Sequence, residues 1–264
     1  MLRTLRRTCP SVLLVVAVLV LTGLSLSPTS FAQAPASTVT EWSAEQRVLL
    51  SFHVNDAALQ KRLPTGWTLA PSTAPGNPGA NLNVTFIDRM VVLDPQGKPL
   101  RQGSSRYVVF VAPAKDANGV TNNVIISGIS PEGAGAYGVN LAATTSQVQK
   151  SAGMEGEAGA RVEERWTFAT ASGERADVQI AYRRAAATKS HAETRLRSAV
   201  RPEFTRTYRI DQSADVIRSA SSPDRVESLK WTIAGPAYAS LFDGSETLLS
   251  VTAFPYYVRE IAVP

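Results

Sequence analysis

Short apolar segments bounded by turn residues recur along this chain, and they limit its fold more than any other feature. Each contains β-branched or aromatic residues, and Gly, Pro, Asn, Asp or Ser lies near its ends. The segments span residues 47–54, 82–87, 107–112, 123–127, 165–169, 177–182 and 205–210. Because only brief helical patterns lie between them, they favour antiparallel strands in a sandwich or barrel over a parallel sheet.

Three segments carry a helical pattern. Asn55 can cap a short helix over residues 57–63, which Pro64 ends. Two further helices are expected over residues 140–150 and 237–249. Strands and helices together predict an α+β fold that is mainly β.

The first residues have the composition of an export signal. Three arginines precede an apolar run of about fifteen residues, and Ala32 and Ala34 supply the small residues that a signal peptidase requires. A membrane-spanning helix needs roughly twenty apolar residues, so an uncleaved anchor is the less favoured alternative. We expect residues 1–34 to be a signal peptide, and the mature protein to be periplasmic or secreted without stable membrane insertion.

Removal of that signal changes the charge and the cysteine content. Without its three arginines the formal net charge falls from +5 to +2, so the basic isoelectric point does not indicate nucleic-acid binding. Cys9 is the only cysteine, so the mature chain would have neither a disulfide nor a catalytic thiolate. We expect a flexible leader over residues 35–43 and a single domain over residues 44–264.

Motifs for metals and cofactors are weak. His53 and His191 are the only histidines and lie far apart in the sequence, so we expect no metal site. The run Gly133-Ala-Gly135-Ala-Tyr-Gly138 matches a dinucleotide-binding pattern, but no alternation of strands and helices surrounds it. We interpret this run as a glycine-rich loop and expect no cofactor.

Five short segments are informative as an ordered set. The first reads Asn-Asp-Ala-Ala-Leu-Gln-Lys-Arg-Leu-Pro over residues 55–64, and a strand pattern over residues 82–88 follows it. The others are Arg-Pro-Glu-Phe over residues 201–204, Gly-Pro with Leu-Phe over residues 235–242, and Tyr-Val-Arg-Glu-Ile over residues 257–261. In this order they resemble the acetoacetate decarboxylase-like family. The resemblance implies an antiparallel β-barrel or cone with small peripheral helices, which encloses a mostly apolar cavity.

The residues that carry out the family's reaction are matched less well than the segments that indicate its fold. A Pro-Lys-Lys run in that family supplies the lysine that forms an imine with a β-keto acid. Here Thr145-Ser146-Gln147 stands at the similar place, and none of these side chains can form an imine. Thr85 stands where the family has an assisting glutamate. The family's carboxylate-binding arginine falls near Glu45 or, after a two-residue slip that preserves strand parity, at Arg47. Together with the export signal, this departure from the family pattern predicts an exported protein that has lost decarboxylation.

We therefore expect a barrel cavity that binds a small organic ligand bearing a carboxylate or carbonyl group. The residues expected to line it are Arg47, His53, Thr85, Tyr107, Asn140, Ser146 and Gln147. Whether the protein is an enzyme stays open at this point, and so does its oligomeric state.

Two alternatives also stay open. The first is a decarboxylase-, aldolase- or dehydratase-like lyase that uses Lys150, which a helix would place on the face of Ser146 and Gln147, or His53 as an acid or base. The second is an interaction module without a pocket, which uses the basic segment 183–209 with its eight Lys/Arg and two acids. Arg206 and Arg209 in this segment have opposite strand parity, so they cannot both point inward.

Overall fold

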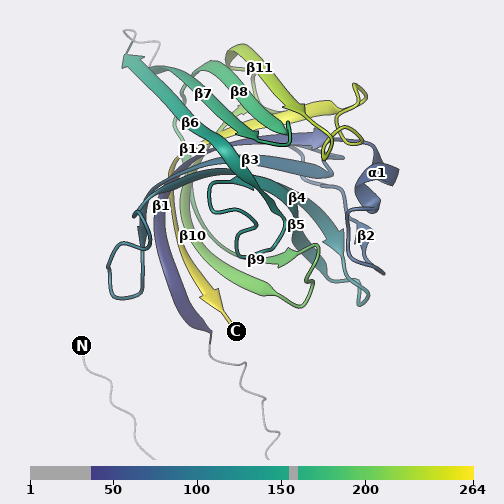
Figure 1. Ribbon diagram of the computed structural model, residues 1–264. Helices are drawn as coiled ribbons and strands as arrows, with labels where there is room; N and C mark the ends of the chain where they lie inside the picture. Colours follow the sequence, from purple (N-terminus) through teal and green to yellow (C-terminus); the bar gives the residue numbers. More distant parts are fainter. Residues whose placement is uncertain (1–36, 155–159) are drawn as a thin grey trace, which may run out of the picture. The chain divides into compact units, whose positions relative to one another are not determined.

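The computed structural model describes residues 37–154 and 160–264, and the predicted signal peptide lies outside them. One short helix and twelve strands make up the described chain (Figure 1). The elements are β1 (Thr38–His53), α1 (Asp56–Gln60), β2 (Thr68–Leu69), β3 (Leu82–Leu93), β4 (Ser105–Lys115), β5 (Thr121–Ser130), β6 (Asn140–Met154), β7 (Ala160–Thr170), β8 (Arg175–Arg183), β9 (Thr188–Ser198), β10 (Thr205–Arg218), β11 (Val226–Ala234) and β12 (Thr247–Val263). Each of the seven predicted strand segments overlaps one of these strands.

Seven strands close into a ring. They pair in the order β5-β9-β10-β12-β1-β3-β4, and β4 pairs again with β5. All of these pairings are antiparallel except the parallel one between β5 and β9. Figure 1 shows the ring end-on, with the loop between β5 and β6 inside it. The predicted barrel, in a fold that is mainly β, is thus confirmed.

A second, antiparallel sheet of β6, β7, β8 and β11 lies against the outside of the ring. A short parallel pairing between β5 and β6 joins it to the ring. Even-numbered residues of β1, such as Val48 and Leu50, are buried in the same apolar cluster as Trp166 and Phe168 of the second sheet. The ring centroids of Phe86 on β3 and Trp166 on β7 are 6.2 Å apart. One core therefore lies between the sheets, and odd-numbered residues in the middle of β1, such as Arg47 and Leu49, face the interior of the ring.

The two longer predicted helices are wrong. Residues 140–150 belong to strand β6, which pairs with β7 so that Ser146 faces Phe168 and Lys150 faces Glu164. Residues 237–249 form turns and then the start of β12. In both regions the pattern is only weakly amphipathic, and pairing with a neighbouring strand outweighs the local helical preference.

The ends of β1 give one confirmation and one correction. Asn55 caps α1 as predicted, because its side chain accepts a hydrogen bond from the Ala58 amide at 3.0 Å. The flexible leader expected over residues 35–43 is too long, since β1 already begins at Thr38, opposite Val263 at the end of β12. Val263 is so distant in the sequence that the composition of residues 35–43 cannot indicate this pairing. Among the described residues, no helix is both long and apolar enough to cross a membrane.

Candidate functional site

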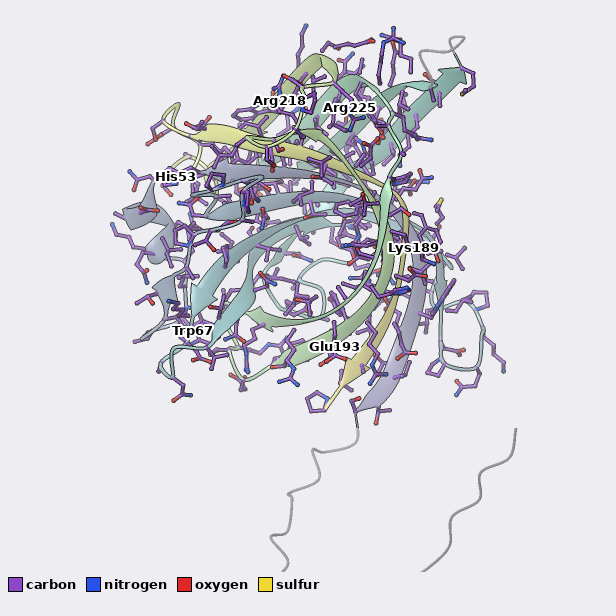
Figure 2. All side chains as sticks on the ribbon, turned by 180° about the vertical axis from the view of Figure 1, so that it is seen from behind. His53, Trp67, Lys189, Glu193, Arg218 and Arg225 are labelled. Atoms are coloured by element: carbon purple, nitrogen blue, oxygen red, sulfur yellow. The ribbon has the colours of Figure 1, made fainter. Side chains whose placement is uncertain are left out.

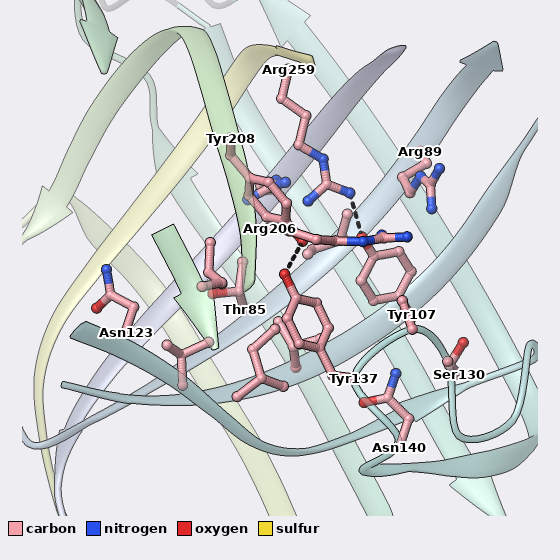
Figure 3. A pocket seen from close by; sticks show the side chains of 18 of the residues that line it. Thr85, Arg89, Tyr107, Asn123, Ser130, Tyr137, Asn140, Arg206, Tyr208 and Arg259 are labelled. Carbon is pink, nitrogen blue, oxygen red and sulfur yellow. Dashed lines mark hydrogen bonds between the residues drawn. The ribbon is translucent and has the colours of Figure 1, made fainter. Parts of the chain in front are cut away.

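A cavity of about 240 Å³ occupies the interior of the ring. Inward-facing side chains of β1, β3, β4, β5, β9, β10 and β12 line it, together with the loop that follows β5 (Figure 3). On β3 the inward residues run from Arg89 through Ile87 and Thr85 to Asn83. The cavity is therefore charged towards one end of the ring and neutral towards the other.

Glu45 is the centre of the charged end. Its carboxylate is fully buried and lies 2.9 Å from Arg259 Nε and 2.5 Å from Arg47 Nη2, and it accepts a hydrogen bond from Ser43 Oγ at 2.6 Å. Burial alone raises the pKa of this carboxyl group, but the two guanidinium groups and the serine outweigh that effect and lower the pKa to about 2. Glu45 is thus a buried anion that holds two arginines in place.

Three further contacts of Arg89 and Arg259 extend this network. Arg89 Nη2 donates to Glu41 Oε1 at 2.5 Å. Arg259 Nη2 donates to the hydroxyl of Tyr107 at 2.7 Å, and its guanidinium lies 4.6 Å from the ring centroid of Tyr208. Tyr107 and Arg259 both line the cavity, so a ligand would meet a phenol that is already hydrogen-bonded to a cation.

Arg206 differs from the other arginines of the cavity. Within the described residues it makes no ion pair, and its Nε, like that of Arg89, is buried without a hydrogen-bond partner. Its guanidinium lies 6.0 Å from the ring centroids of Tyr137 and Phe204. Arg209, three residues further along β10, is exposed and paired with Glu260 at 2.6 Å. The predicted opposite orientation of Arg206 and Arg209 is confirmed.

The neutral end combines apolar walls with amide and hydroxyl groups. Leu49, Val109 and Leu196 supply apolar surface. Asn123 Nδ2 donates to Thr194 Oγ1 at 3.2 Å, and both side chains line the cavity. This end can accommodate a hydrocarbon group and one neutral hydrogen-bonding group.

The glycine-rich run forms the loop between β5 and β6, as interpreted from the sequence. Gly133, Gly135 and Gly138 all have positive φ angles, a conformation that glycine adopts at little cost. Tyr137 in this loop is buried, and its hydroxyl lies 2.8 Å from that of Tyr208 (Figure 3). Ser198 Oγ donates to the Tyr137 carbonyl oxygen at 2.6 Å. These bonds fix the loop as part of the cavity wall.

Four of the predicted pocket residues do line the cavity. They are Arg47, Thr85, Tyr107 and Asn140. Asn140 follows the glycine-rich loop and packs against Gly128, where any Cβ would meet its side chain. The remaining polar lining, including Arg89, Arg206 and Arg259, was not predicted. Strand parity could have indicated Arg89, because it continues the inward series of Thr85.

Three other predicted pocket residues lie elsewhere. His53 is exposed at the end of β1, on the outside of the ring, with Nδ1 2.9 Å from the Gly79 carbonyl oxygen (Figure 2). Ser146 donates to the Arg106 carbonyl oxygen at 3.0 Å, and Gln147 is exposed. Ser146 and Gln147 are displaced because β6 belongs to the second sheet. In residues 37–154 and 160–264, no group of three or more His, Cys, Asp or Glu is arranged to hold a metal ion.

Lys150 also lies outside the ring cavity. Its Nζ is 2.8 Å from Gln46 Oε1, 3.8 Å from Glu164 Oε2 and 4.4 Å from the centroid of the Trp166 ring. Burial lowers the pKa of this amine, although Glu164 partly opposes the shift. On a strand Lys150 shares a face with Ser146 but not with Gln147, so the predicted helical grouping is wrong.

Part of the charge of the basic segment 183–209 is paired, since Arg183, Lys189 and Arg209 make ion pairs. Besides Arg209, Lys189 lies 3.5 Å from Asp211, and Arg197 Nε donates to Asn122 Oδ1 at 3.0 Å. The segment runs from the end of β8 through β9 into β10, so its side chains point to both sides of the ring wall. Arg206, which faces inward, is the cation of the segment that lines the cavity, beside the neutral Thr194, Leu196 and Tyr208.

Comparisons with known proteins identify the fold. No family model and no curated protein matches the sequence. The enduracididine biosynthesis enzyme MppR, solved with the condensation product of pyruvate and imidazole 4-carboxaldehyde, is 12% identical, with 91% of this chain and 93% of that chain covered and a TM-score of 0.50. An acetoacetate decarboxylase-like enzyme from Sphingomonas wittichii RW1 is also 12% identical, with 91% and 97% covered and a TM-score of 0.50. The chain therefore has the fold of the acetoacetate decarboxylase-like proteins.

Proposed function

We propose that the ring cavity binds a small organic anion that bears a carboxylate. The observation that carries this proposal is the excess of positive charge on the cavity wall. Arg101 is paired with Glu132 and Arg89 with Glu41, while Arg47 and Arg259 share Glu45. Arg206 has no counter-charge among the described residues, so an entering carboxylate would supply one.

The neutral end of the cavity supports a ligand with a carbonyl or hydroxyl group as well. Asn123 and Thr194 offer hydrogen-bonding atoms, and Leu49, Val109 and Leu196 offer apolar contact. A neighbour of the same fold, MppR, was solved with a product formed from pyruvate, which is a keto acid. Keto acids are accordingly the first ligands to test.

The ligand panel compares two keto acids, which carry a carboxylate, with a neutral ketone, which does not. Acetoacetate and pyruvate should raise the melting temperature of the purified chain, and acetone should not, because only the acids offer a carboxylate to Arg206. Differential scanning fluorimetry at equal concentrations and equal ionic strength measures the shifts. Equal shifts for acetoacetate and acetone, or none for any acid in a broad panel, would refute anion binding in the cavity.

Loss of imine chemistry is the second part of the proposal. The sequence contains six lysines, all of them in the described ranges, and none lines the cavity. Lys150 is the one with a lowered pKa, which is the observation that favours the alternative of a Schiff-base lyase. Its position on the outside of the ring separates it from the ligands that Arg206 would hold.

Borohydride trapping distinguishes the two functions. After incubation with acetoacetate or pyruvate and reduction, peptide mass spectrometry should find no adduct on any lysine. A reduced adduct on Lys150 would establish a lyase-type amine and would remove the argument for a purely binding role. Free lysine with the same acids serves as the chemical control for reduction.

Export is also part of the proposal, and it rests on the composition of residues 1–34. Cleavage after Ala34 would leave a chain that begins at Pro35. Expression in a bacterial host should yield this shortened chain in the periplasm or medium, as measured by intact mass. Recovery of the uncut chain in the cytoplasm alone would contradict the proposal.

A further inference from the structure

A second hollow, of about 320 Å³, lies outside the ring. It is bounded by β1 and β12 of the ring and by β6, β7 and β8 of the second sheet. Arg47, Lys150 and Arg184 line it, and Glu164 is its one carboxylate among the described residues. We call this space the Lys150 hollow.

Strand pairing holds the polar side chains of the Lys150 hollow in place. Lys150 on β6 pairs with Glu164 on β7, and Tyr182 on β8 lies beside Glu164. Glu164 accepts hydrogen bonds from Trp166 Nε1 at 2.9 Å and from the Tyr182 hydroxyl at 3.0 Å. Its carboxylate is thus oriented by two neutral donors, while Lys150 Nζ remains 3.8 Å away.

The balance of charge in this hollow is positive. Lys150 and Arg184 face the single carboxylate of Glu164, which leaves an excess of one positive charge, because Arg47 is already paired with Glu45. Burial, together with weaker repulsion from Arg106 and Arg184, lowers the pKa of Lys150, so an added anion would stabilise its charged form. Val162, Phe254 and Pro255 provide an apolar wall beside the cations.

Arg47 links the Lys150 hollow to the ring cavity, since it lines both. The pairing of β1 with β12 is irregular here, because Glu45 faces Tyr257 whereas Arg47 faces Phe254. Residues 255 and 256 of β12 are therefore opposed by Gln46 alone, which is a β-bulge in the ring wall. The guanidinium of Arg47 lies 3.5 Å from the Tyr257 ring centroid, at the place where the wall is irregular.

From these contacts we propose that the Lys150 hollow is a second ligand site, which binds a small aliphatic dicarboxylate. Lys150 and Arg184 offer one cationic group to each of the two carboxylates, and the methylene groups between them would contact the apolar wall. Lys150 and Arg184 would bind the carboxylates directly. The site is separate from the ring cavity except for Arg47, and it does not depend on the function proposed for that cavity.

The test uses malonate as the probe and the Arg206→Gln variant of the full chain as the background, so that binding in the ring cavity is weakened. Isothermal titration calorimetry should show that Lys150→Gln and Arg184→Gln each reduce malonate affinity at least tenfold. Lys230→Gln, the same kind of change at an exposed lysine of β11, should leave the affinity unchanged. Absence of malonate binding in the background, or equal affinity in all three variants, would overturn the proposal.

A second measurement needs no variant and therefore does not depend on folding of the substituted chains. Acetylation of the wild-type chain by an N-hydroxysuccinimide ester is followed at each lysine by peptide mass spectrometry. Malonate should slow the modification of Lys150 at least threefold without changing that of Lys230, and acetate should protect Lys150 much less. Equal rates at Lys150 with and without malonate would show that no dicarboxylate binds beside it.

Discussion

Replacing Glu45 with Gln should lower the free energy of unfolding by about 3–5 kcal/mol, because the change leaves two buried arginines without their counter-charge. Glu45 is fully buried between Arg47 and Arg259, and Gln keeps the shape of the side chain but not its charge. Urea unfolding followed by tryptophan fluorescence measures the difference. Glu193→Gln is the matched control, since Glu193 is exposed on β9 and its change should cost less than about 1 kcal/mol.

The pH dependence of the free energy of unfolding is an independent test of the role of Glu45. The pKa of Glu45 is about 2 in the folded chain and near its ordinary value of 4.5 when unfolded, so the unfolded state takes up the proton first as the pH falls. Its contribution to stability is therefore complete above about pH 5 and is lost as the pH approaches 2. Glu45→Gln should lose less stability than the wild-type chain over this interval. Parallel curves for the two proteins, or a difference below 1 kcal/mol at pH 7, would contradict the role assigned to Glu45.

Replacing Arg206 with Gln should weaken the binding of a carboxylate ligand roughly 30-fold, which corresponds to about 2 kcal/mol for a hydrogen bond between charged groups. Stability should change little, because Arg206 makes no ion pair among the described residues that the substitution would break. Calorimetric titration with the best acid of the ligand panel measures the affinity. This variant therefore separates binding from folding, which Glu45→Gln cannot do.

Arg209→Gln provides the matched control for that experiment. Arg209 is on the same strand, three residues away, but it is exposed and paired with Glu260. Its substitution should leave the affinity within about twofold, since a surface ion pair contributes little and the side chain does not face the cavity. Equal losses in both variants would indicate a general effect of net charge, and no loss in either would remove Arg206 from the site.

The sequence predicts the mainly β architecture because alternation along a strand is a local property. The same property correctly places Arg206 and Arg209 on opposite faces of β10, and the structure shows that Arg206 is the inward one. It fails for β6, where residues 140–150 have little apolar pattern and the strand is specified by its pairing with β7. Because of that error, Ser146 and Gln147 were predicted to line the cavity and Lys150 to share their face, but none of the three lines it.

The charged end of the site depends on contacts that no local pattern records. Glu45 and Arg259 are far apart in the sequence and meet because β1 and β12 are neighbours. Arg47 and Thr85 were predicted from the resemblance to the acetoacetate decarboxylase-like family, whereas Arg259 required knowledge of the strand order. Strand parity predicts on which face a residue lies, but not which residue faces it across the ring.

The pairing of the first strand with the last also has a consequence for how the chain reaches its structure. Thr38 lies opposite Val263, so the ring cannot close before nearly the whole chain is available. Contacts between such distant residues give a high contact order, and folding on the millisecond to second scale is typical of such topologies. Until closure, both β1 and β10 present unpaired edges on which another strand could add. Removal of the last strand should therefore produce an aggregating chain instead of a smaller folded one.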